Sequence, residues 1–336
     1  MAERSIVIAG AGAIGCFVGG LLAAAGQPVT LWGRPRVLAP IAAGGLRLSD
    51  FSGLDVVVPR DAARLEEEAA TALAGAGMVL VCVKSGATAA IAAEIAAHAP
   101  PGAPVISLQN GIGNDDILRA CLPGRDVRAG MVPFNVVPEG PAHWHRATSG
   151  DIVIGDGPGD LAARLSVPGL VVRAAPDMAA VQWGKLLLNL NNALNALSGM
   201  TLRAQLLDRG WRRLMADQMA EALAVLKGAG IALRPPTPVP AAVLPHILRL
   251  PTPVFTRLAA QMLTVDPAAR TSMAYDVQAG RGTEIDQLQG LIVSLAAERG
   301  LRAPICTAVA AQVRQVTEAG ITDPHLTPGQ LRGAGD

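Results

Sequence analysis

The sequence has few aromatic residues and almost no net charge. Only 3% of its 336 residues are aromatic although 51% are hydrophobic, so the core must be built from Ala, Val, Leu and Ile. There are 28 basic and 27 acidic residues, for a formal net charge of +1, and no basic run stands out. This balance argues against nucleic acid or a membrane surface as the main partner.

Disulfide, metal and targeting patterns are also missing. The chain has four widely separated cysteines without a CxxC motif, which we interpret as reduced structural thiols: Cys16, Cys82, Cys121 and Cys306. His143 and His145 are spaced by one residue, which is a weak metal signal, so no metal site is expected. No secretory leader and no apolar run of ~18 residues are present, so we expect a cytoplasmic protein without a membrane span.

The N-terminus carries the glycine pattern of a dinucleotide-binding unit. A β-branched run at Ser5–Ala9 leads into GAGAIG, then a helical pattern, then a second strand at Pro28–Trp32. In this context Gly10 allows a tight turn, Gly12 lets pyrophosphate approach the backbone, and Gly15 lets the helix pack closely on the strand. The N–H groups at the helix start would bind the phosphates. The predicted cofactor contacts are therefore Gly10, Ala11, Gly12, Ala13, Ile14 and Gly15.

The end of the second strand indicates which dinucleotide binds. NAD-binding units usually place an acidic residue there, about 20 residues after the glycines, to accept a hydrogen bond from the ribose 2′-hydroxyl. Here Trp32 is followed by Gly33, Arg34, Pro35 and Arg36, and none of these residues is acidic. Arg34 and Arg36 can meet a 2′-phosphate, so the sequence favours NADP over NAD. The alternative is two solvated arginines in a turn.

Two further apolar runs, at Met78–Lys84 and Val105–Asn114, are typical of buried parallel strands. Ligands of doubly wound sheets lie beyond the carboxyl ends of the strands, so Lys84 and Asn110 are expected where cofactor and substrate meet. Plain turn chemistry before Gly111 is the alternative for Asn110. The sequence thus predicts an α/β domain with a doubly wound parallel sheet of Rossmann type, over residues 1–175.

From about Pro176 the pattern becomes helical. Helices are expected over Ala180–Leu197, Ala204–Gly228, Val254–Leu263, Ala268–Gly280, Thr283–Arg299 and Pro304–Glu318. The proline-rich segment Arg234–Pro253 is interpreted as a rigid surface connection. Residues 176–336 are therefore predicted to form an all-α domain, with a ligand cleft between it and the first domain.

The first of these helices holds one lysine and four asparagines among leucines. Asparagine is a poor helix former, because its amide competes for backbone hydrogen bonds. Lys185, Asn189 and Asn192 lie on one helical face, within roughly 60° of one another, whereas Asn191 and Asn195 lie on the other side. The polar face is either a solvated edge or a site for a small polar ligand.

A second polar cluster lies in the stretch RTSMAYDVQAGRGTEID. One straight helix would hold Ser272 and Glu284 ~18 Å apart, too far for one small substrate to contact both. Either the helix breaks at residues 280–282, or Glu284 serves the cofactor while Ser272 serves the substrate. Alternatively, Thr283 is only the cap of the next helix, with acidic residues in its first turn.

Taken together, these motifs resemble those of the ketopantoate reductase (2-dehydropantoate 2-reductase) family. The matching stretches, in order over nearly the whole chain, are GAGAIG, VKS at Val83–Ser85, LQNGIGN at Leu108–Asn114, KLLLN at Lys185–Asn189 and SMAYDVQAGRGTEID at Ser272–Asp286. The resemblance implies NADPH-dependent reduction of the keto group of ketopantoate, on the route to pantothenate and coenzyme A. It also implies a small-molecule substrate in the cleft between the domains. Helical domains of this kind often pair, so a homodimer is expected.

The resemblance implies roles for individual residues of the helical domain. Lys185 matches the family's proton donor, and Glu284 matches a glutamate that contacts the cofactor near the reacting centre. Asn189 matches a residue that holds the hydroxyl end of the substrate, and Ser272 matches another substrate contact. On the cofactor side, Asn110 matches an asparagine that touches both cofactor and substrate.

Two more cofactor contacts follow from the resemblance, and two positions depart from it. Arg34 matches the 2′-phosphate arginine, and backbone near Val136 would approach the nicotinamide. Better-studied members carry a second asparagine where this chain has Ala193, and some carry another where it has Ala269. Asn192 could replace the first of these amides. A different small 2-keto acid, or an NADP(H)-binding regulator without turnover, are the alternative functions.

Overall fold

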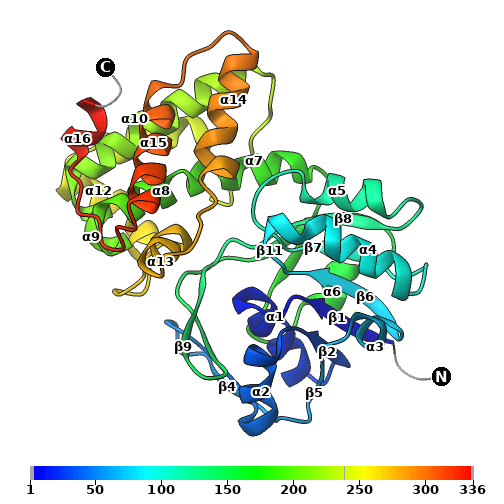
Figure 1. Ribbon diagram of the computed structural model, residues 1–336. Helices are drawn as coiled ribbons and strands as arrows, with labels where there is room; N and C mark the ends of the chain where they lie inside the picture. Colours follow the sequence, from blue (N-terminus) through cyan, green and yellow to red (C-terminus); the bar gives the residue numbers. More distant parts are fainter. Residues whose placement is uncertain (1–3, 238, 334–336) are drawn as a thin grey trace. The chain divides into compact units, whose positions relative to one another are not determined.

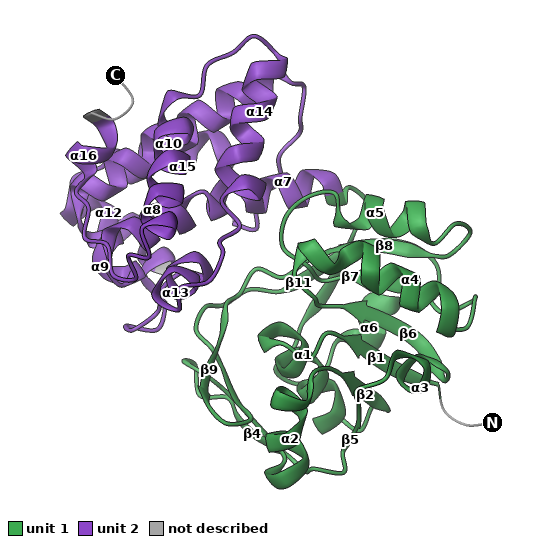
Figure 2. Ribbon diagram, viewed as in Figure 1, with its two compact units in different colours: residues 1–178 green, residues 179–336 purple. Residues whose placement is uncertain are grey.

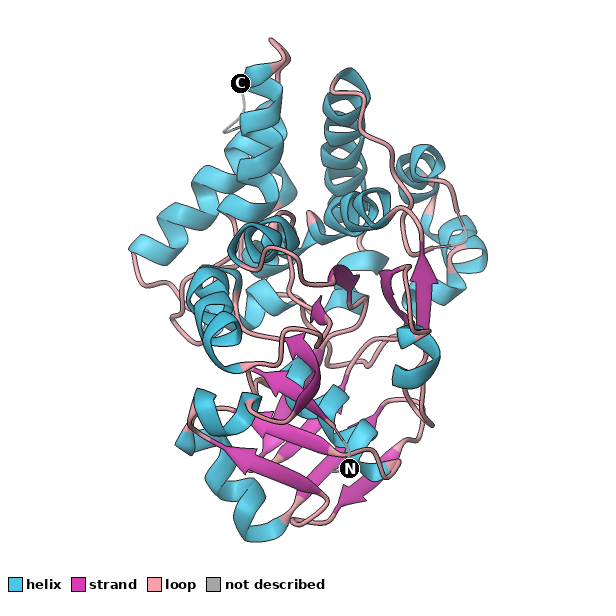
Figure 3. Ribbon diagram, turned by 90° about the vertical axis from the view of Figure 1, so that its right-hand side faces the viewer, coloured by secondary structure: helices cyan, strands magenta, loops and turns pink. Residues whose placement is uncertain are grey.

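The computed structural model describes residues 4–237 and 239–333 (Figure 1). The chain divides into two compact units, Met1–Met178 and Ala179–Asp336 (Figure 2). All the described strands belong to unit 1, and unit 2 is helical (Figure 3). The predicted fold class, an α/β Rossmann-type domain followed by an all-α domain, is confirmed. Among the described residues, no helix is both long and apolar enough to cross a membrane.

An eight-stranded sheet forms the centre of unit 1, in the order β12-β11-β8-β7-β6-β1-β2-β5. Its strands are β1 (Ser5–Ala9), β2 (Val29–Trp32), β5 (Ala63–Glu66), β6 (Ala76–Val81), β7 (Val105–Ser107), β8 (Val127–Met131), β11 (Ile152–Gly155) and β12 (Val172–Ala175). Neighbouring strands run parallel except for β8 and β11. The strand order reverses between β1 and β6, which is where doubly wound sheets bind their ligands.

Helices cover both faces of this sheet (Figure 1). They are α1 (Ala13–Ala24), α2 (Pro35–Gly44), α3 (Ala69–Leu73), α4 (Thr88–His98), α5 (Asn114–Cys121) and α6 (Leu161–Leu165), with a short 3₁₀ turn η1 (Ser85–Ala87). Successive strand residues point to opposite faces. Ile8 therefore packs in one core cluster with Phe17 of α1, and Val7 in the other with Ile95 of α4. Burial on both faces explains the continuous apolar runs of the sequence.

A second sheet of four strands, in the order β4-β3-β10-β9, was not predicted from the sequence. Its strands are β3 (Leu46–Asp50), β4 (Asp55–Val58), β9 (Val136–Gly140) and β10 (His143–Arg146). Arg146 pairs with Asp50 and stacks 5.5 Å from the ring centroids of both Phe17 and Phe134. The two histidines lie in β10, where Ser49 Oγ contacts His143 Nε2 and His145 Nδ1. No cluster of three or more potential metal ligands occurs in the part of the chain that the structure describes.

Unit 2 consists of helices of very different lengths. They are α7 (Met178–Asn189), α8 (Asn191–Ser198), α9 (Leu202–Leu207), α10 (Arg209–Gly228), α11 (Leu244–Arg249), α12 (Thr252–Leu258), α13 (Ser272–Gln278), α14 (Leu291–Glu298), α15 (Pro304–Glu318) and α16 (Pro328–Gly333). Short turns are the 3₁₀ helices η2 (Ala241–Val243) and η3 (Ala260–Leu263), and the π-helix η4 (Asp286–Gly290). Three predicted helices are interrupted, at Leu190, at Ala259 and at Asp208, whose side chain caps α10.

The interpretation of the proline-rich segment as only a surface connection was wrong. The segment carries η2 and α11, and Leu244 and Leu248 are buried. Arg212 of α10, 1% exposed, donates hydrogen bonds to the carbonyls of Leu248 and Leu250. Proline is tolerated in the first turn of a helix, where its missing N–H has no partner to lose, and Pro245 and Pro253 occupy the first turns of α11 and α12.

Candidate active site

In the glycine turn between β1 and α1, protein atoms pack closely against Gly10 and Gly15 but not against Gly12. A Cβ at Gly10, whose φ is +111°, would lie 2.8 Å from Val83 Cγ1, and a Cβ at Gly15 would lie 2.2 Å from the Gly10 carbonyl. At Gly12, which is exposed, a Cβ would meet no protein atom within 4 Å. Gly10 and Gly15 are therefore required by the fold, whereas the space beside Gly12 suits the close approach of a ligand.

The start of α1 presents backbone donors to this space. The N–H groups of Gly10 and Ala11 donate to the Trp32 carbonyl, which fixes the turn against β2. The helix then begins at Ala13 without a side-chain cap and without an acidic residue in its first turn. The first N–H groups of a helix have no intrahelical partner and carry positive potential. A phosphate would accept hydrogen bonds from these N–H groups, and its negative charge would be stabilised by the positive potential.

Two arginines follow the end of β2, as the sequence predicted. Arg34 is the residue before the first turn of α2, and both Arg34 and Arg36 are exposed. The first turn of α2 contains no acidic residue. The end of β2 thus offers positive charge and no carboxylate acceptor for a ribose hydroxyl.

Asn110 lies on a loop that is fixed by side-chain hydrogen bonds. Its carbonyl accepts bonds from Ser85 Oγ at 2.9 Å and from Asn114 Nδ2 at 2.7 Å. Asn114 Oδ1 lies 2.9 Å from Thr88 Oγ1, which extends the network to α4. The left-handed backbone conformation is taken by Gly111, with φ of +88°, so turn strain does not require the asparagine. Sequence reasoning missed Asn114 and Thr88 as residues that hold this loop.

The remaining cofactor-side residues occupy different parts of unit 1. Lys84, at the N-terminal cap of η1 after β6, is exposed. Val136 is the first residue of β9, is partly buried, and pairs with Arg146 of β10. Lys84 and the glycine turn therefore follow β6 and β1, the two strands that flank the point where the strand order reverses.

Lys185 is the central titratable group of unit 2. It lies on α7 and is partly buried, and burial lowers its pKa from 10.5 to about 8. The negative charge of Glu284 opposes this effect and raises the pKa of Lys185. The structure therefore brings together Lys185 and Glu284, which are far apart in the sequence. An ammonium with a lowered pKa beside a carboxylate is a candidate for proton transfer.

The polar face of the first predicted helix, formed by Lys185, Asn189 and Asn192, is continuous across the break between α7 and α8. Leu190 keeps helical dihedral angles, with φ of −57° and ψ of −26°. Lys185 and Asn189 lie one turn apart on α7, and Asn192 follows on α8, so they remain on one face. Asn189 and Asn192 are both partly exposed.

The other two asparagines are structural. Asn191 and Asn195 are 6% and 0% exposed, and both donate to Gln205 Oε1, at 3.2 and 3.1 Å. Gln205 Nε2 donates back to Asn191 Oδ1 at 3.1 Å. The asparagines of this helix thus serve two purposes. One pair satisfies a buried amide network, and the other pair remains accessible.

The same network places Ser272. The N–H of Thr271 donates to Asn195 Oδ1, and its hydroxyl oxygen lies 3.1 Å from the carbonyl of Asn192. Thr271 also caps α13, whose first residue is Ser272. Because Thr271 is bound to Asn192, α13 begins close to Asn192, and its first residue, Ser272, is partly exposed.

The polar stretch after Ser272 is not one straight helix. Helix α13 ends at Gln278, Gly280 takes a φ of +61°, and the next helical turn begins only at Asp286. The alternative that Thr283 caps this turn was wrong, because Ile285 precedes it without a side-chain cap. The break at residues 280–282 is confirmed.

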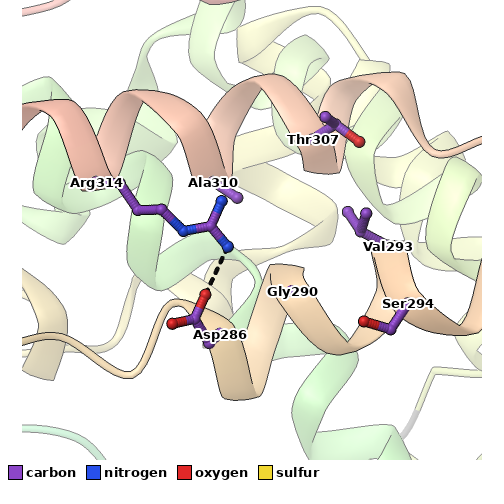
Figure 4. Close-up of a pocket in the computed structure, with 7 residues that line it drawn as sticks. All are labelled: Asp286, Gly290, Val293, Ser294, Thr307, Ala310 and Arg314. Atoms are coloured by element: carbon purple, nitrogen blue, oxygen red, sulfur yellow. Dashed lines mark hydrogen bonds and ion pairs between the residues drawn. The ribbon is translucent and has the colours of Figure 1, made fainter.

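A separate small pocket lies beside η4. It measures about 190 Å³ and is lined by Asp286, Gly290, Val293, Ser294, Thr307, Ala310 and Arg314 (Figure 4). Its charged groups, Asp286 and Arg314, form an ion pair at 2.5 Å and are both largely exposed. None of the residues predicted for the active site lines it.

Family comparisons agree with this arrangement. Residues 6–159 match the family described as Ketopantoate reductase PanE/ApbA, and residues 177–317 match Ketopantoate reductase PanE/ApbA C terminal. The chain belongs to the ketopantoate reductase family. It is therefore an oxidoreductase with a small-molecule substrate and a nicotinamide cofactor. The family resemblance predicted from the sequence motifs is confirmed.

Three relatives illustrate the extent of the similarity. A ketopantoate reductase of this family from Ralstonia eutropha JMP134 is 32% identical with a TM-score of 0.78, covering 94% of this chain and 99% of that chain. A 2-dehydropantoate 2-reductase of Halobacterium salinarum is 28% identical, over 94% of this chain and 99% of its own length. A D-mandelate dehydrogenase, solved with NADH and anilino(oxo)acetate, is 21% identical with a TM-score of 0.73 and covers 94% of this chain and 99% of that chain. It shares the fold.

Proposed function

We propose that this protein reduces 2-dehydropantoate to pantoate with NADPH, as a step of pantothenate and coenzyme A biosynthesis in the cytoplasm. The observation that carries the proposal is the state of Lys185, a partly buried lysine whose pKa is lowered to about 8 and which is kept charged by Glu284. Asn189 and Asn192 lie on the same helical face as Lys185, and Ser272 follows Thr271, whose hydroxyl donates to the Asn192 carbonyl at 3.1 Å. A 2-keto acid with a hydroxyl group suits this set.

Lys185 is the proposed proton donor and Glu284 its partner. When bound, the nicotinamide would supply the hydride for the 2-keto carbon, and the carbonyl oxygen of the substrate would then carry the negative charge. The Lys185 ammonium donates a hydrogen bond to this oxygen and transfers a proton to it, and the amine then regains a proton from solvent. Its positive charge stabilises the developing oxyanion, which is usually the larger contribution to the rate. A pKa of about 8 allows the lysine both to hold and to release its proton near neutral pH.

The substrate hydroxyl is assigned to Asn189, with Asn192 as the second amide. The side chain of Ala193, where better-studied members of the family carry asparagine, is fully buried, whereas Asn192 is partly exposed. Asn192 lies on the face of Lys185, so it can supply the amide that position 193 lacks. Ser272 begins α13 next to it and completes the substrate contacts.

NADPH is assigned to the residues of unit 1. The glycine turn of residues 10–15 would hold the pyrophosphate, and Arg34 the 2′-phosphate by charge-assisted hydrogen bonds. Lys84, Asn110 and the backbone at Val136 would contact the rest of the cofactor. The space beside Gly12 and the uncapped start of α1 support this assignment.

A second candidate is the same reaction on another small 2-keto acid. It is favoured by Ala193 and Ala269, because both replace amides that family members direct at the substrate, and both are buried here, at 0% and 1% exposure. A less polar pocket would accept a less polar side chain on the keto acid. The proposed reaction type, cofactor and proton donor are unchanged in this candidate.

The test is steady-state oxidation of NADPH with ketopantoate, beside NADH and a panel of 2-keto acids that includes benzoylformate. Lys185→Ala should lower kcat roughly 10²- to 10⁴-fold. The matched control is Lys227→Ala, which removes an exposed lysine of α10 and should leave kcat unchanged. The highest kcat/KM with another keto acid would favour the second candidate. NADPH binding without turnover of any keto acid would contradict both candidates and indicate a regulator. Light scattering tests the expected homodimer.

A further inference from the structure

The break between α7 and α8 is held by two buried glutamines from elsewhere in unit 2. Gln218 Nε2, on α10, donates to the Leu190 carbonyl at 2.9 Å, and Gln289 Nε2, on η4, donates to the same carbonyl at 2.7 Å. Both glutamines are 0% exposed. A helix interior normally uses a carbonyl for one backbone N–H, and side chains that insert there interrupt the helix. The two amides thus account for the interruption at Leu190.

The two glutamines contact each other, because Gln289 Nε2 also donates to Gln218 Oε1 at 3.4 Å, but only Gln289 lies on the segment that carries Glu284. Gln289 lies five residues after Glu284, on the π-helical turn η4, and the Gly290 N–H donates to the Ile285 carbonyl at 3.0 Å within this turn. Gln218 lies instead in the middle of the long helix α10. The two side chains therefore make the same kind of bond to Leu190 but attach different elements to it.

Gln289 closes a ring of contacts around Lys185. From Lys185 the helix runs five residues to Leu190, whose carbonyl is bound by Gln289. From Gln289 the chain runs back through the start of the π turn and Ile285 to Glu284, five residues earlier, which interacts electrostatically with Lys185. π-helical turns are rare and occur frequently at functional sites. The ring makes the position of Glu284 relative to Lys185 depend on one buried amide.

We propose that Gln289 is a positioning residue of the active site, which holds Glu284 beside Lys185 by binding the Leu190 carbonyl. The proposal rests on the proposed function for the role of Lys185 in catalysis, but the geometry it describes does not. Without the Gln289 amide, the π turn loses its bond to Leu190, and Glu284 can move away from Lys185. The lysine then loses the charge that opposes its desolvation, so its pKa falls further.

The lysine titration can be measured directly, because the chain contains only three lysines, Lys84, Lys185 and Lys227. Protein labelled with ¹³C at the lysine ε carbon gives few signals, and Lys185→Gln identifies the one from Lys185. Gln289→Met replaces the amide by an apolar side chain of similar size, and we expect the Lys185 midpoint to fall by about half a pH unit or more. Gln218→Met is the matched control. It removes the other bond to Leu190 and the acceptor that Gln289 Nε2 has 3.4 Å away, but it keeps the Gln289–Leu190 bond at 2.7 Å, so it should leave the midpoint in place.

Kinetics and stability separate positioning from a merely structural role. Both variants should lower Tm, because each removes a buried hydrogen bond, but only Gln289→Met should move the alkaline limit of kcat to lower pH. If Gln289→Met does not fold, Gln289→Asn takes its place, because the shorter side chain withdraws the amide from Leu190. An unchanged Lys185 midpoint in a folded Gln289 variant, or an equal shift in Gln218→Met, would overturn the positioning role. Absence of turnover in the unmodified protein would instead contradict the proposed function and leave the NMR result to decide this one.

Discussion

The backbone N–H of Thr271 donates to Asn195 Oδ1 at 2.9 Å, across 76 residues of sequence. This bond joins the buried asparagines of α8 to the cap of α13, and so to Ser272. Asn195, on the buried side of α8, thereby helps to position the partly exposed Ser272 of α13. The buried and the accessible asparagines should therefore be substituted in parallel, because we expect the former to affect stability and the latter to affect substrate binding.

Asn195→Ala and Asn192→Ala should separate stability from substrate binding. Asn195→Ala leaves the buried Thr271 N–H without its acceptor and removes one of the two hydrogen bonds to Gln205 Oε1, and we expect the free energy of unfolding to fall by about 2 kcal/mol. Asn192→Ala removes a partly exposed amide, so stability should change by less than about 0.5 kcal/mol while KM for the keto acid rises roughly tenfold. Urea unfolding and steady-state kinetics measure both effects. The reverse pattern would show that Asn192 is structural.

The pH dependence of kcat should report Lys185. A proton donor must be protonated, so kcat should fall as pH rises through the Lys185 pKa of about 8. Glu284 raises this pKa, and Glu284→Gln should therefore move the alkaline limit to lower pH. Asp286→Asn is the matched control, because Asp286 is exposed and pairs with Arg314 instead. An alkaline limit that stays in place in Glu284→Gln would remove Glu284 from the vicinity of the reacting proton.

Local patterns predicted the parts of the fold that local chemistry determines. The turn at Gly10 and the strand ends at Lys84 and Asn110 follow from glycine spacing and apolar runs, and α15 has the bounds that the sequence predicted. The interruption at Leu190 could not be predicted, because it depends on Gln218 and Gln289, which are 28 and 99 residues away.

The same limit explains the other failures. The small sheet pairs β3 with β10 across nearly a hundred residues, and neither strand is marked by a long apolar run. The proline-rich segment was misread because prolines signal turns, while the buried Leu244 and Leu248 between them carry the packing. Candidate side chains can be selected from a sequence by type and spacing, but their partners are selected by tertiary contacts.

Arg34→Gln should reduce the preference for NADPH. The arginine is exposed at the start of α2, where the loss of its charge disturbs no packing. Charge-assisted hydrogen bonds to a phosphate are strong, so KM for NADPH should rise roughly 10- to 100-fold while KM for NADH stays within about twofold. Arg60→Gln, which changes another exposed arginine of unit 1, serves as the control. Equal effects on both cofactors would show that Arg34 does not contact the 2′-phosphate.

Gly12→Ala and Gly15→Ala should distinguish a cofactor contact from a packing requirement. A Cβ at position 15 would lie 2.2 Å from the Gly10 carbonyl, so Gly15→Ala should lower the free energy of unfolding by at least about 2 kcal/mol. A Cβ at position 12 meets no protein atom within 4 Å, and Gly12→Ala should fold normally. It should nevertheless raise KM for NADPH roughly tenfold, because the new methyl group fills the space assigned to pyrophosphate. Unchanged NADPH binding in Gly12→Ala would place the cofactor elsewhere.

Lys185 should lower the free energy of unfolding of the protein at neutral pH. Burial lowers its pKa from 10.5 to about 8, so between these values the unfolded chain binds more protons than the folded one, and stability rises with pH. Below this window the folded protein must hold a desolvated charge. Lys185→Met removes that cost and should raise the free energy of unfolding at pH 7 by roughly 1–3 kcal/mol, with the gain shrinking towards pH 10.

Urea unfolding of unit 2, followed by helical circular dichroism at both pH values, measures this gain. Lys227→Met, at an exposed position, should change stability little at either pH. A Lys185→Met variant that is less stable at pH 7 would mean that attraction to Glu284 outweighs the desolvation of the lysine. The ammonium would then be bound more firmly than a proton donor for catalysis requires, because a lysine held by such a pair keeps its proton at neutral pH.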